Sequence, residues 1–189
     1  MMVTLDQKEA ILRARQFLER KPVFLDTETT GTGPAAEIIE VAIVDHEGIV
    51  LLEELVKPKG AIEPAAFQVH GIPPELLQGK PTWKDAWPRV EAVLAGKQVG
   101  IYNSEFDVRM MRQSHQKYWM DWRFPEHNFF CVMKLYAQFF GKWDSRRGSY
   151  SWHSLDQAGK QCGIPLQNSH RAKDDALLAR ELLLHMARL

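Results

Sequence analysis

Acidic residues occur at three places in the sequence where a helix or strand is expected to begin or end. They are Asp26 and Glu28 in VFLDTETTG, Asp107 in NSEFD, and Asp174 and Asp175 in HRAKDDA. Successive side chains of a strand point to opposite faces, so Asp26 and Glu28 would share one face. Two neighbouring carboxylates repel each other, so either a proton or a cation must lie between them. The spacing of Asp26 and Glu28 therefore makes them candidate ligands of a metal ion.

The first pair also has a plain structural interpretation. The segment PVFLD, residues 22–26, has the composition of a buried strand, with Pro22 at the first position, which a strand tolerates. The Thr29-Thr30-Gly31 that follows resembles a turn. Asp26 and Glu28 could therefore lie in a solvated loop, and the pair alone does not decide between the two interpretations.

Asp107 has a structural alternative as well. It lies three residues after Ser104, which we expect to cap a helix that runs to about Lys117. A carboxylate at that spacing completes a capping box and stabilises the start of the helix. Asn103, at the end of the preceding strand, would then begin the turn.

The third group lies on the last helix, where Asp175 shares the spacing of an apolar face and Asp174 lies on another side. That face is formed by Ala172, Ala176, Ala179, Leu183 and Met186. Both acids would also suit the first turn of a helix. His170 cannot share a helical face with Asp175, because five residues rotate about 140°. It must reach any common site from the loop before the helix, and a surface or packing role is its alternative.

Taken together, the acids come from three different elements, each near the end of a strand or the first turn of a helix. In a mixed α/β sheet such ends can converge on one edge. Asp26, Glu28, Asp107 and Asp175 would then demand divalent cations, and hard oxygen ligands select Mg²⁺ or Mn²⁺. Two such ions are a common arrangement for cleaving a phosphodiester.

The elements that must position these residues alternate along the chain. Apolar and turn patterns predict strands over 22–26, 37–45, 49–58 and 97–103, and a short strand feeding a helix over 129–140. The HEG link between the second and third strands favours an antiparallel hairpin. Helices are expected over 5–20, 64–71, 82–96, 104–117, from Ser154 onward, and over 172–189. Thr4 and Gln7 have capping-box spacing at the start of the first helix, whose apolar stripe would be Ile11, Leu12, Phe17 and Leu18. The order of strands and helices favours one α/β domain, a mixed sheet covered by helices.

At this point the sequence resembles a known family. DTETTG at 26–31, NSEFD at 103–107 and HRAKDDA at 170–176, in this order, resemble the three exonuclease motifs of the DnaQ-like superfamily, in the variant named DEDDh. FQVHGI at 67–72 is similar to the family segment between the first two motifs. The resemblance covers residues 22–189, which we interpret as the exonuclease domain. Residues 1–21 lie outside it and are expected to form a helix packed on that domain.

The resemblance implies an RNase H-like fold, a five-stranded mixed β-sheet with helices on both faces. It also implies a 3′-to-5′ exonuclease that uses two divalent cations. In that interpretation Asp26, Glu28, Asp107 and Asp175 are the metal ligands, and the spacing from His170 selects Asp175 over Asp174. His170 would be the general base, since an ordinary histidine accepts a proton near neutral pH. The product would be a nucleoside 5′-monophosphate.

The resemblance also marks residues that would contact the terminal nucleotide. They are Thr29, His70 and Phe106, with Asn103 added as a candidate beside them. Core packing is the alternative for Phe106, and a role at a helix end is the alternative for His70.

The segment GKWDSRRGSYSWHS, residues 141–154, is a candidate for holding the upstream strand. It offers cations for phosphates and aromatic rings for stacking on bases, namely Lys142, Trp143, Arg146, Arg147, Tyr150 and Trp152. A solvated loop with its aromatic side chains packed inward is the alternative. The cations of the first helix, such as Arg13 and Arg20, fit packing or a protein partner better than nucleic acid.

The composition excludes several classes of protein. The 189 residues carry 24 basic and 24 acidic side chains, so the protein is not a wholesale polyanion-coating protein. Its two cysteines, Cys131 and Cys162, are far apart and fit a reducing compartment. The charged N-terminal residues lack the apolar core of a signal peptide, and no apolar run is long enough for a membrane span. We therefore expect a cytoplasmic protein.

Three functions stay open at this level. The first is a proofreading or repair exonuclease on single-stranded DNA, which the DTETTG form favours over RNA. The second is an RNA-trimming exonuclease on the same scaffold, and the third is an inactive nucleic-acid-binding module. The chain ends within its last helix. A polymerase, a repair protein or a second copy of the chain would therefore have to dock on the surface of the domain.

Overall fold

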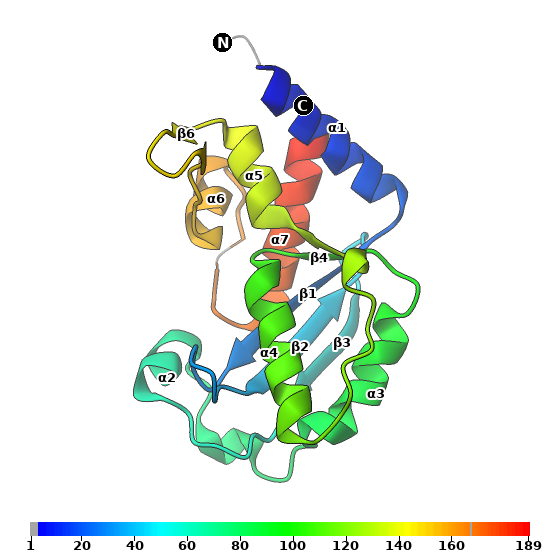
Figure 1. The fold of residues 1–189 in the computed structure, drawn as a ribbon, viewed down its shortest axis with the longest axis vertical. Coiled ribbons are helices and arrows are strands. Elements are labelled where there is room, and N and C mark those ends of the chain that lie inside the picture. The colour runs from blue at the N-terminus through cyan, green and yellow to red at the C-terminus, as the bar shows by residue number, and fades with distance from the viewer. Residues whose placement is uncertain (1–3, 167) are drawn as a thin grey trace.

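The computed structural model describes residues 4–166 and 168–189, and its centre is a sheet of five strands (Figure 1). The strands are β1 (Val23–Thr29), β2 (Ile38–Val44), β3 (Val50–Leu55), β4 (Val99–Ile101) and β5 (Phe129–Cys131). Their order across the sheet is β3-β2-β1-β4-β5. The first three are antiparallel neighbours, whereas β4 and β5 run parallel to β1. The predicted five-stranded mixed sheet is confirmed.

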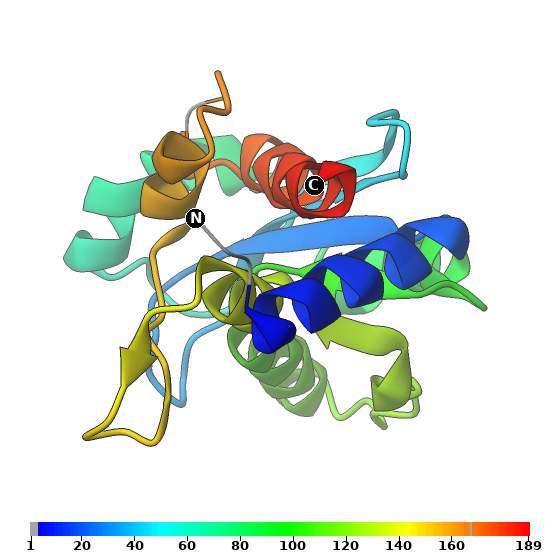
Figure 2. The same cartoon turned by 90° about the horizontal axis from the view of Figure 1, so that it is seen from above.

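Helices cover both faces of this sheet, as predicted. They are α1 (Leu5–Glu19), α2 (Pro64–His70), α3 (Trp83–Leu94), α4 (Ser104–Lys117), α5 (Val132–Phe140), α6 (Leu155–Gln161) and α7 (Ala172–Arg188), with short 3₁₀ turns at Pro74–Leu77 and Glu126–Asn128. Figure 2 shows α7 and α4 on opposite sides of the sheet. Among the described residues, no helix is both long and apolar enough to cross a membrane.

Each face of the sheet has its own hydrophobic core. Side chains of β1 point alternately into one core and the other. Phe24 packs into the core beneath α1, α5, α6 and α7, while Val23 and Leu25 pack into the core beneath α3 and α4. Asp26 and Glu28 continue the side of Phe24, and Thr27 continues the side of Leu25. The two faces of β1 therefore lead to different helices at the end of the strand that carries the acids.

The first helix packs on the domain, and residues 1–3 before it lie outside the described residues. Thr4 and Gln7 form the expected capping box, and Ala10 and Ala14 are fully buried against the core that contains α5 and α7. The expected apolar stripe is wrong at Leu12, which is 55% exposed. The other members of that stripe, Ile11, Phe17 and Leu18, are buried or pack against the core as expected, and the small alanines let the helix backbone approach its neighbours closely.

Two further expectations need correction. The cap of α4 is Asn103 rather than Ser104, which is the first helical residue, and Asn103 makes no side-chain capping bond. The loop 141–154 contains a small antiparallel hairpin, β6 (Trp143–Asp144) with β7 (Ser149–Tyr150). Two-residue strands leave too little apolar periodicity for the sequence to reveal them.

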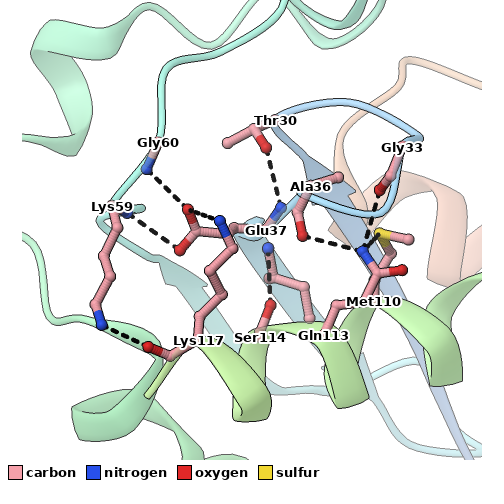
Figure 3. Close-up of polar contacts among 11 residues, drawn as sticks. Thr30, Gly33, Ala36, Glu37, Lys59, Gly60, Met110, Gln113, Ser114 and Lys117 are labelled. Atoms are coloured by element: carbon pink, nitrogen blue, oxygen red, sulfur yellow. Dashed lines mark hydrogen bonds and ion pairs between the residues drawn. The ribbon is translucent and has the colours of Figure 1, made fainter. Parts of the chain in front are cut away.

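A buried carboxylate anchors the loop between β1 and β2 (Figure 3). Glu37 accepts hydrogen bonds from the backbone N–H groups of Lys59 (3.1 Å) and Gly60 (2.8 Å). Lys117 of α4 lies 3.7 Å from the same carboxylate. The N–H of Glu37 in turn donates to the Thr30 hydroxyl at 3.0 Å. These contacts hold the loop after the acidic strand end against α4.

Candidate active site

Asp26 and Glu28 lie within β1 rather than in a loop beyond it. The strand continues to Thr29, and the register pairs Asp26 with Ala42 and Glu28 with Glu40 of β2. Strand geometry therefore places both carboxylates on the face that α7 covers. The alternative of a solvated turn at these residues is wrong.

Asp175 joins this pair from the first turn of α7. It is buried, and its backbone N–H donates to the Arg171 carbonyl at 3.1 Å as part of that turn. Asp26, Glu28 and Asp175 each offer a carboxylate oxygen, and these three oxygens lie within 4.8 Å of one another. Asp174 points elsewhere, since its carboxylate accepts a hydrogen bond from the Ser169 hydroxyl at 2.7 Å.

Asp107 approaches from the opposite side of the sheet. Its carboxylate accepts hydrogen bonds from the Thr27 backbone N–H at 3.1 Å and from the Thr27 hydroxyl at 2.7 Å. The side chain is therefore held on β1, so the capping-box interpretation of Asp107 is wrong. It is not part of the closely spaced trio of carboxylates, although its charge still affects Asp26.

The pKa values of all four acids are raised, so the ionised forms are unfavourable in the metal-free site. Burial raises the pKa of Asp26 well above its ordinary value, and the charges of Asp107, Asp175 and Glu28 add to the rise. Burial and the Asp175 charge raise the pKa of Glu28 to about 9. Burial also raises the pKa of Asp107 to about 7, against the two hydrogen bonds from Thr27. The pKa of Asp175 is raised to about 7, again mainly by burial.

The donor set fits hard divalent cations. Every group in the cluster is a carboxylate, and oxygen ligands are those that Mg²⁺ and Mn²⁺ prefer. The Asp175 Oδ1 atom is buried and has no hydrogen-bond partner among the described residues. A cation would satisfy this atom and offset the burial and the neighbouring charges that raise the pKa values of Asp26 and Glu28. Asp26, Glu28 and Asp175 would hold it, with Asp107 beside them.

His170 lies on the loop before α7, where the sequence analysis placed it. Its backbone is left-handed, with φ of 53°, and its N–H donates to the Asn168 side chain at 3.2 Å. The imidazole is exposed. The residue lies five positions before Asp175, with no hydrogen bond from its ring among the described residues.

An ion pair between Glu40 and Arg171 lies beside the cluster, and the sequence did not predict it. Glu40 is 1% exposed and lies directly opposite Glu28 in the sheet. Both its oxygens lie 3.1 Å from the Nε of Arg171, and one accepts a hydrogen bond from the Ala172 N–H at 3.0 Å. The sequence does contain a sign of this pair, because a glutamate inside the apolar run EIIEVAIV would be buried and a buried charge requires a partner.

The four candidate substrate residues differ in their surroundings. Thr29 is buried, and its hydroxyl donates to the Gly31 carbonyl at 2.7 Å. His70 ends α2 and is buried, with Nδ1 accepting a hydrogen bond from the Ile72 N–H at 2.9 Å. Burial lowers the pKa of His70, and its Nε2 has no partner among the described residues. Phe106 is half-buried against the core beneath α4, and Asn103 is exposed.

The loop 141–154, which contains the hairpin of β6 and β7, presents aromatic side chains to solvent. Trp143 is 58% exposed and Trp152 is 54% exposed, so the alternative of inward packing is wrong for these two rings. Tyr150 packs edge-on against Trp143, with 5.2 Å between the ring centroids, and its hydroxyl bonds Asp6 of α1. Arg147 lies 3.6 Å from Asp144.

Comparisons with known proteins show which family the chain resembles. A family model described as exonuclease matches residues 23–183. An uncharacterized exonuclease of Escherichia phage 186 is 36% identical over 168 residues, which cover 86% of either chain. The DNA polymerase III subunit epsilon of Escherichia coli K12 is 31% identical over 121 residues, 59% of this chain and 49% of that subunit.

Solved structures share the fold. Escherichia coli exonuclease I in complex with a dA16 oligonucleotide superposes with a TM-score of 0.67 at 20% identity, covering 84% of this chain and 39% of that one. The chain thus spans less than half the length of exonuclease I and of the epsilon subunit.

Because the family model spans all five strands and all four acids, the chain belongs to the exonuclease family. It is a member of the DnaQ-like superfamily with an RNase H-like fold, as the resemblance implied, and exonucleases of this type depend on metal ions. The protein is therefore an enzyme that hydrolyses phosphodiester bonds at the end of a nucleic acid.

Proposed function

We propose that this exonuclease removes nucleoside 5′-monophosphates from the 3′ end of single-stranded DNA. The observation that carries the proposal is the group of carboxylate oxygens from Asp26, Glu28 and Asp175 within 4.8 Å of one another, with Asp107 held beside them on Thr27. Support for DNA comes from exonuclease I, which was solved with a dA16 oligonucleotide.

The four acids are the proposed ligands of two Mg²⁺ ions, with Mn²⁺ as a substitute. Divalent cations in such a site supply the positive charge that activates water and offsets charge on the leaving oxygen. Asp26 and Glu28 would hold the ions from β1, Asp175 from α7 and Asp107 from α4. The raised pKa values support this, since bound cations replace the protons that the cluster otherwise needs.

His170 is the proposed general base. It would take a proton from the attacking water, whose oxygen forms a new bond to phosphorus as the bond to the leaving 3′ oxygen breaks. An exposed imidazole on a loop beside buried acids can reach a water on the solvent side of the phosphate. Its backbone is left-handed, so the residue does not continue the helix of α7. On that helix it would face away from Asp175, because five residues rotate about 140°.

The terminal nucleotide would lie between the residues that surround the cluster. We propose contacts with the backbone at Thr29, whose hydroxyl is already bonded to Gly31, and with His70, Asn103 and Phe106. The exposed rings of the loop 141–154, Trp143 and Trp152, would stack on upstream bases, because stacking on exposed aromatic rings suits a single strand.

The wider setting is proposed on the same basis. Residues 22–189 would form the exonuclease unit, with the preceding helix packed against it, and the family model over residues 23–183 supports this division. The relative in DNA polymerase III supports a polymerase or repair partner docked on the surface, and a homodimer is the other candidate. Cys131 and Cys162 are both free thiols, which suits the reducing cytoplasm.

Strands labelled at one end test the polarity and the substrate. With Mg²⁺, a 5′-labelled DNA strand should give a ladder that shortens gradually, whereas a 3′-labelled strand should release labelled mononucleotide at once. A matched RNA strand should react more slowly. Immediate release of the 5′ label would overturn the polarity, and faster RNA cleavage would favour the RNA-trimming alternative.

A further inference from the structure

An ion pair between the buried Glu40 and the half-exposed Arg171 ties the start of α7 to strand β2. The Glu40 carboxylate accepts hydrogen bonds from the Arg171 Nε–H, at 3.1 Å to each oxygen, and from the Ala172 N–H at 3.0 Å. Glu40 is almost completely buried, whereas the Arg171 side chain is 43% exposed. The contact joins residues 131 and 132 positions apart in the chain, so only the tertiary fold creates it.

This contact replaces the usual helix cap. Arg171 is the N-cap residue of α7, and it makes no side-chain capping bond to its own helix. The first N–H groups of a helix lack partners within it, and an acceptor with negative charge stabilises that end. Glu40 supplies this acceptor from the sheet, so it fixes where α7 begins relative to β1 and β2.

The residues that Glu40 holds lie between two groups of the candidate active site. His170 directly precedes Arg171, and Asp175 follows one turn later with its N–H bonded to the Arg171 carbonyl at 3.1 Å. A shift of Arg171 would therefore move both the proposed base and a proposed metal ligand. Hydrogen bonds from the backbones of Ser169 and His170 to the Asp175 carboxylate come from the same loop, so they would shift together with Arg171.

Glu40 itself is not placed as a metal ligand. The carboxylates that gather for a cation are Asp26, Glu28 and Asp175, and Glu40 is not among them. Its oxygens are occupied by Arg171 and Ala172. The guanidinium also places a positive charge near Glu28, against the surrounding acids.

We propose that Glu40, through its ion pair with Arg171, is a positioning residue that sets His170 and Asp175 against the acids of β1. The proposal rests on the proposed function, because Asp175 is a metal ligand only in that proposal, but metal binding can be measured without cleavage. Partners of this kind, one step removed from the metal ligands, commonly change affinity or activity by about 10- to 100-fold.

The chain offers a matched control two residues further along. Lys173 of the same helical turn lies 3.2 Å from Glu53 of β3, in a pair whose side chains are 37% and 41% exposed. An exposed pair of this kind contributes little to stability. Glu40→Gln and Glu53→Gln therefore remove the same charge from the partners of one helix start, in one case a buried carboxylate and in the other an exposed one.

Calorimetric titration of Mn²⁺ is the first measurement. Glu40→Gln should weaken Mn²⁺ binding about tenfold, because Asp175 loses its position, while Glu53→Gln should bind as the wild type does. Equal Mn²⁺ affinity in wild type and Glu40→Gln would overturn the proposal. This readout needs no substrate, so a wild type that binds Mn²⁺ but fails to cleave DNA would overturn the proposed substrate and still leave the role of Glu40 open to this test.

A second variant guards against unfolding. Arg171→Met alone would leave Glu40 buried without its cation, so the double variant Glu40→Gln/Arg171→Met removes both charges together. It should retain the circular dichroism and cooperative thermal unfolding of the wild type, yet show the same loss of Mn²⁺ affinity. Wild-type Mn²⁺ affinity in the folded double variant would contradict the positioning role.

Turnover separates positioning from a general loss of stability. At saturating Mg²⁺, Glu40→Gln should lower kcat about tenfold with little change in KM. If Glu40 acts through His170, adding Glu40→Gln to His170→Ala should cost clearly less than it costs the wild type. Full multiplication of the two losses would show that Glu40 does not act through His170.

Discussion

The Asp107 carboxylate of α4 accepts two hydrogen bonds from Thr27 of β1, at 3.1 Å from the backbone N–H and 2.7 Å from the hydroxyl. Thr27 stands between Asp26 and Glu28 in the strand and points to the opposite face. The fourth acid is thus fixed by the one side chain that separates the first two. Both hydrogen bonds also favour the ionised form of Asp107, against the burial that raises its pKa.

Thr27→Val should disturb the orientation of Asp107 and leave the strand intact. Valine keeps the branched shape that suits a strand but cannot donate the hydroxyl bond. We expect kcat to fall about tenfold and the pKa of Asp107 to rise further. Thr30→Val is the control, because it loses a buried bond to the Glu37 N–H but contacts no acid of the cluster. Similar kcat values in the two variants would contradict the role of Thr27.

His170→Ala should lower kcat by about 10²- to 10⁴-fold, because no group remains to accept the proton of the attacking water. Metal binding should survive, since the carboxylates stay in place. Single-turnover kinetics and Mn²⁺ calorimetry on the same preparation provide the two values. A matching loss of Mn²⁺ affinity would make His170 a ligand instead of a base.

The metal-free protein should lose stability as the pH rises. The folded-state pKa values of Asp107 and Asp175 are raised to about 7 and that of Glu28 to about 9, so the folded state binds more protons than the unfolded state. Their contribution is complete below about pH 4 and disappears as the pH passes these folded-state values.

Urea denaturation in chelator between pH 6.5 and pH 9 measures this slope. That range avoids most of the opposite contribution of His70 and His115, whose pKa values burial lowers. Glu28→Gln should flatten the fall in unfolding free energy, and saturating Mg²⁺ should abolish it. A wild type that gains stability across this range in chelator would be inconsistent with a cluster that needs cations.

Neutralising the hairpin cations should weaken strand binding and reduce its dependence on salt. If Arg146 and Arg147 each contact one phosphate, the double change to Gln should reduce the slope of log K against log salt by about 1.4. The single change at Arg146 should have the larger effect, because Arg147 lies near Asp144. Arg123→Gln, in a separate exposed pair with Asp121, is the control. An unchanged slope would remove the hairpin from the interface.

The sequence predicted those parts of the site that depend on local periodicity. Alternation along β1 placed Asp26 and Glu28 on one face, and helical spacing placed Asp175 on the buried face of α7. Capping patterns likewise predicted the start of α1 at Thr4 and of α6 at Ser154, because a cap involves neighbours three residues apart.

What the sequence did not predict depends on segments that meet only in the folded protein. Asp107 has good capping spacing, and its contact with Thr27 appears only when α4 packs across the sheet. Glu40 lies in a run that is buried throughout, so its partner Arg171 follows from the approach of α7 and not from the pattern of the strand. The hairpin at Trp143 was not predicted, because its two-residue strands are too short to show a strand pattern.

The metal dependence of nucleotide release tests the central claim most directly. The rate from 5′-labelled single-stranded DNA should be measured as Mg²⁺ is titrated into the chelated wild type and into Asp26→Asn. The wild type should be inactive in chelator and gain activity with Mg²⁺, while Asp26→Asn should remain at least about 10³-fold slower at every concentration. Cleavage in chelator, or recovery of Asp26→Asn at high Mg²⁺, would contradict a carboxylate-held metal site as the origin of the activity.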